Sequence, residues 1–140
     1  MRVTLGFDYG LARVGVAVGN SLTGTARALP MLPPPRDKAG WDAVSRVVRE
    51  WQPAEFIVGM PPQSAGNEAL LSAIRRFALE LQQRYALPVH WVDESLSSRS
   101  AAGELRDARA AGLKSNRVRP GDEDSLAAAA LLQQFYTDGR

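Results

Sequence analysis

Three acidic residues, far apart in the chain, stand where apolar segments end. Asp8 ends an alternating apolar stretch, Glu94 follows the apolar run 89–92, and Asp124 stands where the last helical pattern begins. If the three carboxylates converge, they repel one another unless a divalent cation neutralises them. Oxygen ligands, in a chain without cysteine and with one histidine, suit Mg²⁺ or Mn²⁺ rather than Zn²⁺. Two such ions about 4 Å apart can activate a water and stabilise the leaving oxygen in phosphodiester cleavage.

Each of these acids also has a purely structural explanation. Asp124 could cap its helix, since aspartate is a favoured N-cap residue. Glu94, with Asp93 before it, could lie on a surface turn, and Asp8 could form an Asx-turn before Gly10. The spacing permits a metal site and leaves both interpretations open.

Size and composition bound the class of protein. A length of 140 residues suits one domain, residues 1–140, and 45% hydrophobic with 23% charged residues is typical of a globular chain. We expect no disulfides, because the chain has no cysteine. The first residues resemble no signal peptide and no apolar run reaches the length of a membrane span, so we expect a cytoplasmic protein with no membrane partner.

Positive charge is concentrated in one stretch. From Arg99 to Arg119 there are six basic residues against two acidic ones, and no acid lies between Ala108 and Gly121. Lys114, Arg117 and Arg119 fall in this stretch, which could bind phosphates or could be a solvated loop.

Hydrophobic periodicity indicates the elements that must position these residues. Strands are expected at 3–8, 14–18, around 25–32, 56–58 and 89–92, and helices at 41–51, about 70–85, from Ser97 or Ser98 to Gly112, and from about 122 onwards. This order predicts an α/β fold, with three antiparallel strands followed by two parallel ones in a mixed sheet flanked by helices. Ligands bind at the carboxyl ends of strands in such sheets.

The aromatic side chains and the single histidine receive a structural interpretation. We expect the three tryptophans, Trp41, Trp51 and Trp91, to pack in the core, and His90 to pack or face solvent rather than to act as a base. Gly59, Met60 and the two prolines that follow are expected to close the strand at 56–58.

The whole chain resembles the YqgF/RuvX family of RNase H-like nucleases. The resemblance is carried, in the family's order, by GFDYGLARVGVAV with GNSLTGTARALP, then EFIVGMPPQSAGNE, then VDESLSS, and finally DSLAAAALLQQF. Members are described as Holliday junction resolvases and as nucleases that mature the 5′ end of small-subunit ribosomal RNA precursor.

The resemblance implies a site and a substrate. The family's three acids fall on Asp8, Glu94 and Asp124, which would be both catalytic residues and ligands of two Mg²⁺ or Mn²⁺ ions, with Asp122 as an alternative last ligand. Lys114, Arg117 and Arg119, with Arg13, would then bind nucleic acid. The implied partners are precursor rRNA or branched DNA and ribosomal particles, with the protein a monomer or a homodimer.

The chain departs from the family pattern at two places, and two other functions compete. Leu11-Ala12 stand where the family often has Thr-Lys, and Ser95 replaces the usual arginine after the glutamate. Asp-Tyr-Gly also resembles the phosphate loop of sugar kinases and actin-like ATPases, but these need two such domains. A non-catalytic module that binds rRNA or DNA junctions is the other alternative. The residues do not choose between RNA and DNA.

Overall fold

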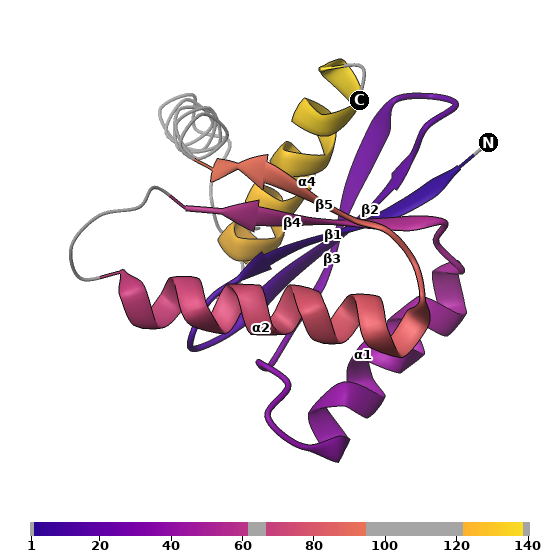
Figure 1. The fold of residues 1–140 in the computed structure, drawn as a ribbon. Helices are drawn as coiled ribbons and strands as arrows, with labels where there is room; N and C mark the ends of the chain where they lie inside the picture. The colour runs from indigo at the N-terminus through magenta and orange to yellow at the C-terminus, as the bar shows by residue number, and fades with distance from the viewer. Residues whose placement is uncertain (1, 62–66, 95–121, 139–140) are drawn as a thin grey trace.

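The fold is a five-stranded mixed sheet with helices on both faces (Figure 1). The computed structural model describes residues 2–61, 67–94 and 122–138, and of residues 122–124 the backbone only. The strands lie in the order β3-β2-β1-β4-β5. β1–β2 and β2–β3 pair antiparallel, whereas β1–β4 and β4–β5 pair parallel. The strands are β1 (Val3–Tyr9), β2 (Val14–Asn20), β3 (Thr25–Leu32), β4 (Glu55–Met60) and β5 (Val89–Asp93). The helices are α1 (Lys38–Trp51), α2 (Glu68–Tyr85) and α4 (Asp122–Thr137).

The first face of the sheet is covered by α1 and α2. Alternate residues of β1 point to this face, and Phe7 meets Phe77 of α2 edge-on with ring centroids 5.3 Å apart. Trp41 of α1 stacks on the same Phe77 at 5.6 Å. These aromatic contacts join both helices to one apolar core.

Of the described helices, only α4 covers the second face, and it lies close to the strands because they present small residues there. A Cβ added to Gly6 would lie 2.9 Å from Cγ of Leu132, and one added to Gly19 would lie 2.7 Å from the Tyr136 hydroxyl oxygen. Ala17 between them is fully buried in this second core. The central part of the sheet is thus buried on both faces, as expected for strands that run as near-continuous apolar segments.

Most of the predicted elements are confirmed, and the differences have local causes. Helix α1 begins at Lys38 rather than Trp41, because Asp37 caps it by accepting from the Gly40 amide at 3.0 Å. Strand β4 continues through Gly59 and Met60, which were predicted to close it, because they pair with Val92 and Asp93 of β5. The predicted helix at 97–112 and the basic stretch up to Gly121 lie outside the described residues.

The prediction that all three tryptophans pack in the core was wrong for Trp91. Its side chain is 47% exposed, and β5, which carries it, is the last strand at one edge of the sheet. Trp41 is buried, and Trp51 is partly buried against the core. None of the helices described here is both long enough and apolar enough to span a bilayer.

Candidate metal centre

Asp8 lies near the carboxyl end of the central strand β1. Gly6 contacts α4 and Phe7 contacts the opposite face, so alternation places Asp8 on the α4 face. Asp8 pairs with Gly15 of β2 in the antiparallel register. It lies at the end of the sheet where β1, β4 and β5 all have their carboxyl ends. This is the position predicted from the sequence.

Glu94 follows β5 and reaches Asp8 across the intervening strand. The neighbouring strand β4 carries Gly59 at this level, and a Cβ there would lie 2.5 Å from Oε2 of Glu94. The carboxyl group therefore lies in the space that a side chain at Gly59 would fill. Asp8 and Glu94 are joined by a side-chain hydrogen bond. We call these two residues the carboxyl pair.

The electrostatics of the carboxyl pair favour a proton or a cation between its members. Burial, the nearby charge of Asp8, the hydrogen bond with Asp8 and the charge of Asp93 together raise the pKa of Glu94 from 4.5 to about 8. Two carboxylates can share a hydrogen bond only if one of them is protonated. A divalent cation can replace that proton, so the donor set fits Mg²⁺ or Mn²⁺.

The first turn of α4 is held beside the same strand ends. The register between β2 and β3 shifts between Val14 and Val16, and the Val16 amide donates to Oγ of the buried Ser125 at 3.3 Å. Val16 pairs with Phe7, the neighbour of Asp8 in β1. The backbone of Asp124, immediately before Ser125, is thereby brought to this end of the sheet.

The remaining predicted site residues divide into two groups. Arg13 is exposed and follows the turn between β1 and β2, two residues from the Gly15 that pairs with Asp8. Lys114, Arg117 and Arg119 lie outside the described residues, and so do the side chains of Asp122 and Asp124. Among the side chains that are described, no group of three or more Asp, Glu or His lies together in a way that could hold a metal.

The sequence analysis missed two residues that shape the site, Gly59 and Ser125. Gly59 was assigned to a turn because two prolines follow it closely, although a glycine ending a buried strand also signals the close approach of another group. Ser125 stands in the helix start next to Asp124, and no pattern in the sequence indicated its contact with β2.

A second polar cluster lies at the opposite end of the α4 face, where β1 and β4 begin. We call it the Glu55 cluster; it consists of Arg2, Thr4, Glu55, His90 and Tyr136. Thr4 donates to Oε2 of Glu55 at 3.0 Å, and Nε2 of His90 lies 3.2 Å from Oε1. The Tyr136 hydroxyl donates to Thr4 at 2.9 Å. Arg2, 3.5 Å from Glu55, is mostly exposed.

The arrangement of sheet and helices is an RNase H-like fold, as solved structures show. The Thermus thermophilus RuvC solved with a Holliday junction substrate has a TM-score of 0.62 at 21% identity, covering 98% of this chain and 95% of that one. The fowlpox virus Holliday junction resolvase has a TM-score of 0.51 at 15% identity, covering 98% of both chains. At these identities the likeness is one of fold.

Sequence comparison gives the family. The family model RuvX, described as Holliday junction resolvase, matches residues 2–138, and the chain belongs to this family, also called YqgF. A relative from Burkholderia thailandensis is 44% identical over 133 residues, 94% of this chain and 85% of its own length. Another, from Cupriavidus pinatubonensis, is 41% identical over 133 residues, 94% of this chain and 86% of its own. Both are named "Putative pre-16S rRNA nuclease".

Proposed function

We propose that this protein is a metal-dependent endonuclease that acts on structured nucleic acid, and that its substrate is the 5′ end of pre-16S ribosomal RNA. The observation that carries the proposal is the carboxyl pair at the end of the central strands, where Asp8 and Glu94 lie in hydrogen-bond contact. The names of the relatives support a nuclease of this substrate class. The fold of the resolvases supports the same reaction on a branched DNA substrate.

In this proposal Asp8, Glu94 and Asp124 hold one or two divalent cations, Mg²⁺ or Mn²⁺. Such ions supply an activated water and stabilise charge on the leaving oxygen. Asp8 and Glu94 give up their shared proton to bind them, and Gly59 leaves room for Glu94 to do so. Ser125 fixes the first turn of α4 against β2, and with it the position of the third acid.

The basic residues have a separate part in the proposal. Lys114, Arg117 and Arg119, with Arg13, contact phosphates of the nucleic acid backbone and so position the scissile bond. Lysine and arginine contacts of this kind are independent of base sequence, and they account for binding to either RNA or DNA.

The substrate is tested by supplying precursor rRNA and a four-way DNA junction side by side, with Mg²⁺, with Mn²⁺ and with EDTA. We expect metal-dependent cleavage of the rRNA precursor at its 5′ side. Preferred cleavage of the junction would support the Holliday junction resolvase instead. Binding of either substrate, with no cleavage in any metal, would support a non-catalytic processing factor.

Three variants test the proposed metal ligands in the same assay. Asp8→Asn is expected to bind substrate and to cleave at most about 10⁻³ as fast as the unmodified protein, because one ligand charge is lost. Asp124→Ser keeps a capping residue and is expected to lose activity, whereas Asp122→Ser is expected to remain active. The reverse result for the last two variants would move the ligand to Asp122.

A further inference from the structure

A pocket of about 450 Å³ lies on the other face of the sheet from the carboxyl pair, between the end of β1, the segment before α1, and α2. Its walls combine flat aromatic rings with arginines. The lining residues that matter here are Tyr9, Arg36, Trp41, Arg76, Phe77 and Glu80. The metal site described above uses none of them.

Three aromatic rings form the floor and one wall of the pocket. Tyr9 packs on Phe77 with ring centroids 5.0 Å apart, and Trp41 stacks on the Phe77 ring with centroids 5.6 Å apart and an interplanar angle of 23°. Phe77 and Trp41 are buried, whereas Tyr9 is only partly covered. The contacts hold Tyr9 in place beside open space, which suits stacking of a planar ring.

The charge at the rim is positive. Arg36 and Arg76 are both exposed, and Arg76 forms no ion pair with the part of the chain that the structure describes. The one acid in the lining, Glu80, is already paired with Arg84 at 2.7 Å. The guanidinium group of Arg84 in turn lies 4.6 Å above the Trp41 ring. Two arginines are therefore left to bind an anion.

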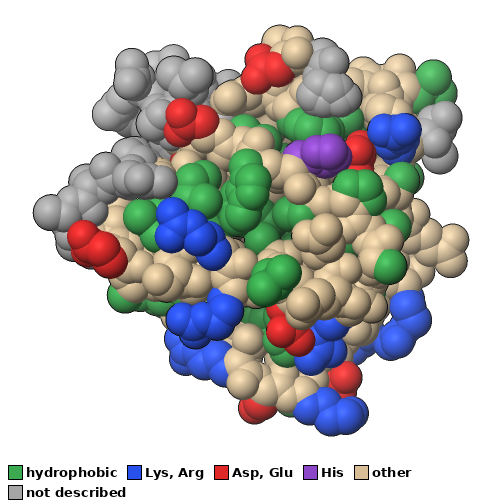
Figure 2. All heavy atoms as spheres, viewed as in Figure 1, with side chains coloured by type: hydrophobic (Ala, Val, Ile, Leu, Met, Phe, Trp, Pro, Cys, Tyr) green, Lys and Arg blue, Asp and Glu red, His purple; other side chains and the backbone are tan. Residues whose placement is uncertain are grey.

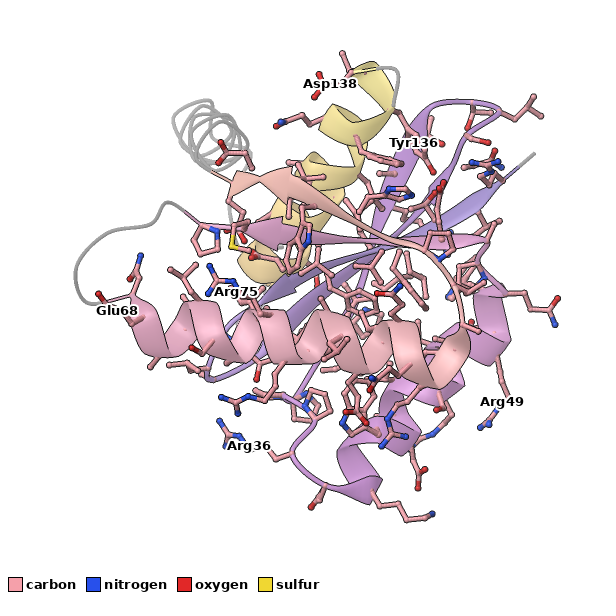
Figure 3. All side chains as sticks on the ribbon, viewed as in Figure 1. Arg36, Arg49, Glu68, Arg75, Tyr136 and Asp138 are labelled. Carbon is pink, nitrogen blue, oxygen red and sulfur yellow. The ribbon has the colours of Figure 1, made fainter. Side chains whose placement is uncertain are left out.

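The basic side chains near the pocket can be located in two views of the whole molecule. Figure 2 shows basic side chains gathered over and below α2 on the face towards the viewer. Figure 3 places Arg36 below α2, on the segment that leads into α1, and Arg49 far away at the other end of α1. Basic side chains therefore lie near the pocket and also continue beyond it along this side of the molecule.

The pocket and the carboxyl pair lie at the same end of β1, on opposite faces of the sheet. Asp8 and Tyr9 are consecutive and point to opposite faces of the sheet. The turn that follows is closed by the Gly10 amide donating to the Arg13 carbonyl at 3.0 Å. Arg36 braces it by donating from Nη2 to the Leu11 carbonyl at 2.7 Å, which leaves its other guanidinium donors for a ligand.

We propose that this pocket binds one nucleotide of a single-stranded segment of the substrate, next to the phosphate that is cleaved. The base stacks on Tyr9, and its phosphate is bound by Arg36 and Arg76. The single-stranded nucleic acid runs from the carboxyl pair over the turn after Tyr9 to reach the pocket. The inference rests on the proposed nuclease function, because that function supplies the polymer.

The phosphate contacts are tested by binding without cleavage. A fluorescein-labelled single-stranded RNA 12-mer is titrated in EDTA, with fluorescence anisotropy as the readout, at several salt concentrations. Arg36→Ala/Arg76→Ala is expected to bind about tenfold more weakly and to lower the slope of log affinity against log salt by about 0.7, because the two arginines share one phosphate of the single strand. The matched control Arg46→Ala/Arg49→Ala removes two exposed arginines of α1 that do not line the pocket.

The control decides what the result means. A pocket-specific loss supports the proposal, and equal losses in both double variants, or none in either, would overturn it. Because the assay contains no metal, a negative result here together with cleavage of the rRNA precursor would remove the pocket and leave the nuclease standing. Absence of cleavage together with a loss of binding specific to the pocket variant would support the pocket and contradict the nuclease function.

The stacking contact needs a second readout. The same 12-mer carrying single 4-thiouridine substitutions is cross-linked by light, and the modified peptides are identified by mass spectrometry. We expect cross-links in the peptides that contain Tyr9 or Trp41, and their loss in Arg36→Ala/Arg76→Ala. Cross-links confined to other peptides would show that the arginines bind phosphate while no base enters the pocket, and would overturn this part of the inference.

Discussion

The sheet face covered by α4 carries a polar cluster at each end, and the two clusters differ in whether their carboxyl groups are matched by hydrogen-bond donors. In the Glu55 cluster each acceptor oxygen of the carboxylate faces a donor, from Thr4 on one side and from Arg2 and His90 on the other. In the carboxyl pair, Glu94 faces the like group of Asp8, and its pKa rises to about 8. Buried polar groups that serve packing are normally matched in this first way. The second arrangement is costly to the fold, and such cost is characteristic of functional sites.

The sharpest test of this contrast compares two crowded glycines of the sheet. Gly59→Ala pushes a methyl group into Glu94 and Leu131, whereas Gly6→Ala meets Leu132 and Ile57 but no carboxylate. Both are expected to lower the free energy of unfolding by about 1–3 kcal/mol through overpacking. Only Gly59→Ala should also slow cleavage by the folded protein, by about 100-fold, because it displaces Glu94. Urea unfolding and cleavage rates measure the two effects, and equal rates in the two variants would contradict this role of Gly59.

The Glu55 cluster is expected to respond in the opposite way. Glu55→Ala leaves the fully buried Thr4 hydroxyl without its acceptor and should lower the free energy of unfolding by about 2 kcal/mol. Arg2→Ala should cost less than about 1 kcal/mol, since that side chain is mostly exposed. Cleavage per folded molecule should be unchanged in both variants. A loss of cleavage in Glu55→Ala at full stability would mean that the cluster belongs to the reaction.

A further effect that we expect is a pH dependence of stability in the metal-free protein. The pKa of Glu94 is about 8 in the folded chain against an ordinary 4.5, so between these values the folded state holds more protons than the unfolded state. Its contribution to stability is therefore complete below pH 4.5 and is lost as the pH rises to about 8. Urea midpoints in EDTA at pH 5 and pH 8 should show this loss relative to Glu94→Gln, which does not titrate. Added Mg²⁺ should remove the difference at pH 8.

Local patterns were sufficient to predict most of the fold. The alternation in β1 and β2 and the apolar stripe of α2 depend on residues close together in the chain, and these elements lie where they were expected. The resemblance to a family then implied that Asp8 and Glu94 converge, whereas the order of the strands in the sheet was not predicted. Neither follows from periodicity, because parallel pairing joins residues that are far apart in sequence.

What the sequence did not reveal depends on such long-range contacts. Glu55 and His90 stand in different strands, and nothing near either residue indicates the other. The pocket draws Tyr9, Arg36 and Arg76 from three separate segments, each unremarkable alone. Trp91 fits the pattern of a core residue, and only its place on an edge strand leaves it exposed.

Helix α4 follows the described strands in the chain, and this order links the assembly of the site to synthesis. All five strands precede it, so a nascent chain can form the sheet while the apolar surface around Ile57 and Ala17 is still uncovered. That surface is closed only when Leu131, Leu132 and their neighbours have left the ribosome. The same helix carries the proposed third acid, so a partly made or truncated chain would lack the ligand and the cover together. We therefore expect a nuclease built in this order to be inactive until α4 has left the ribosome.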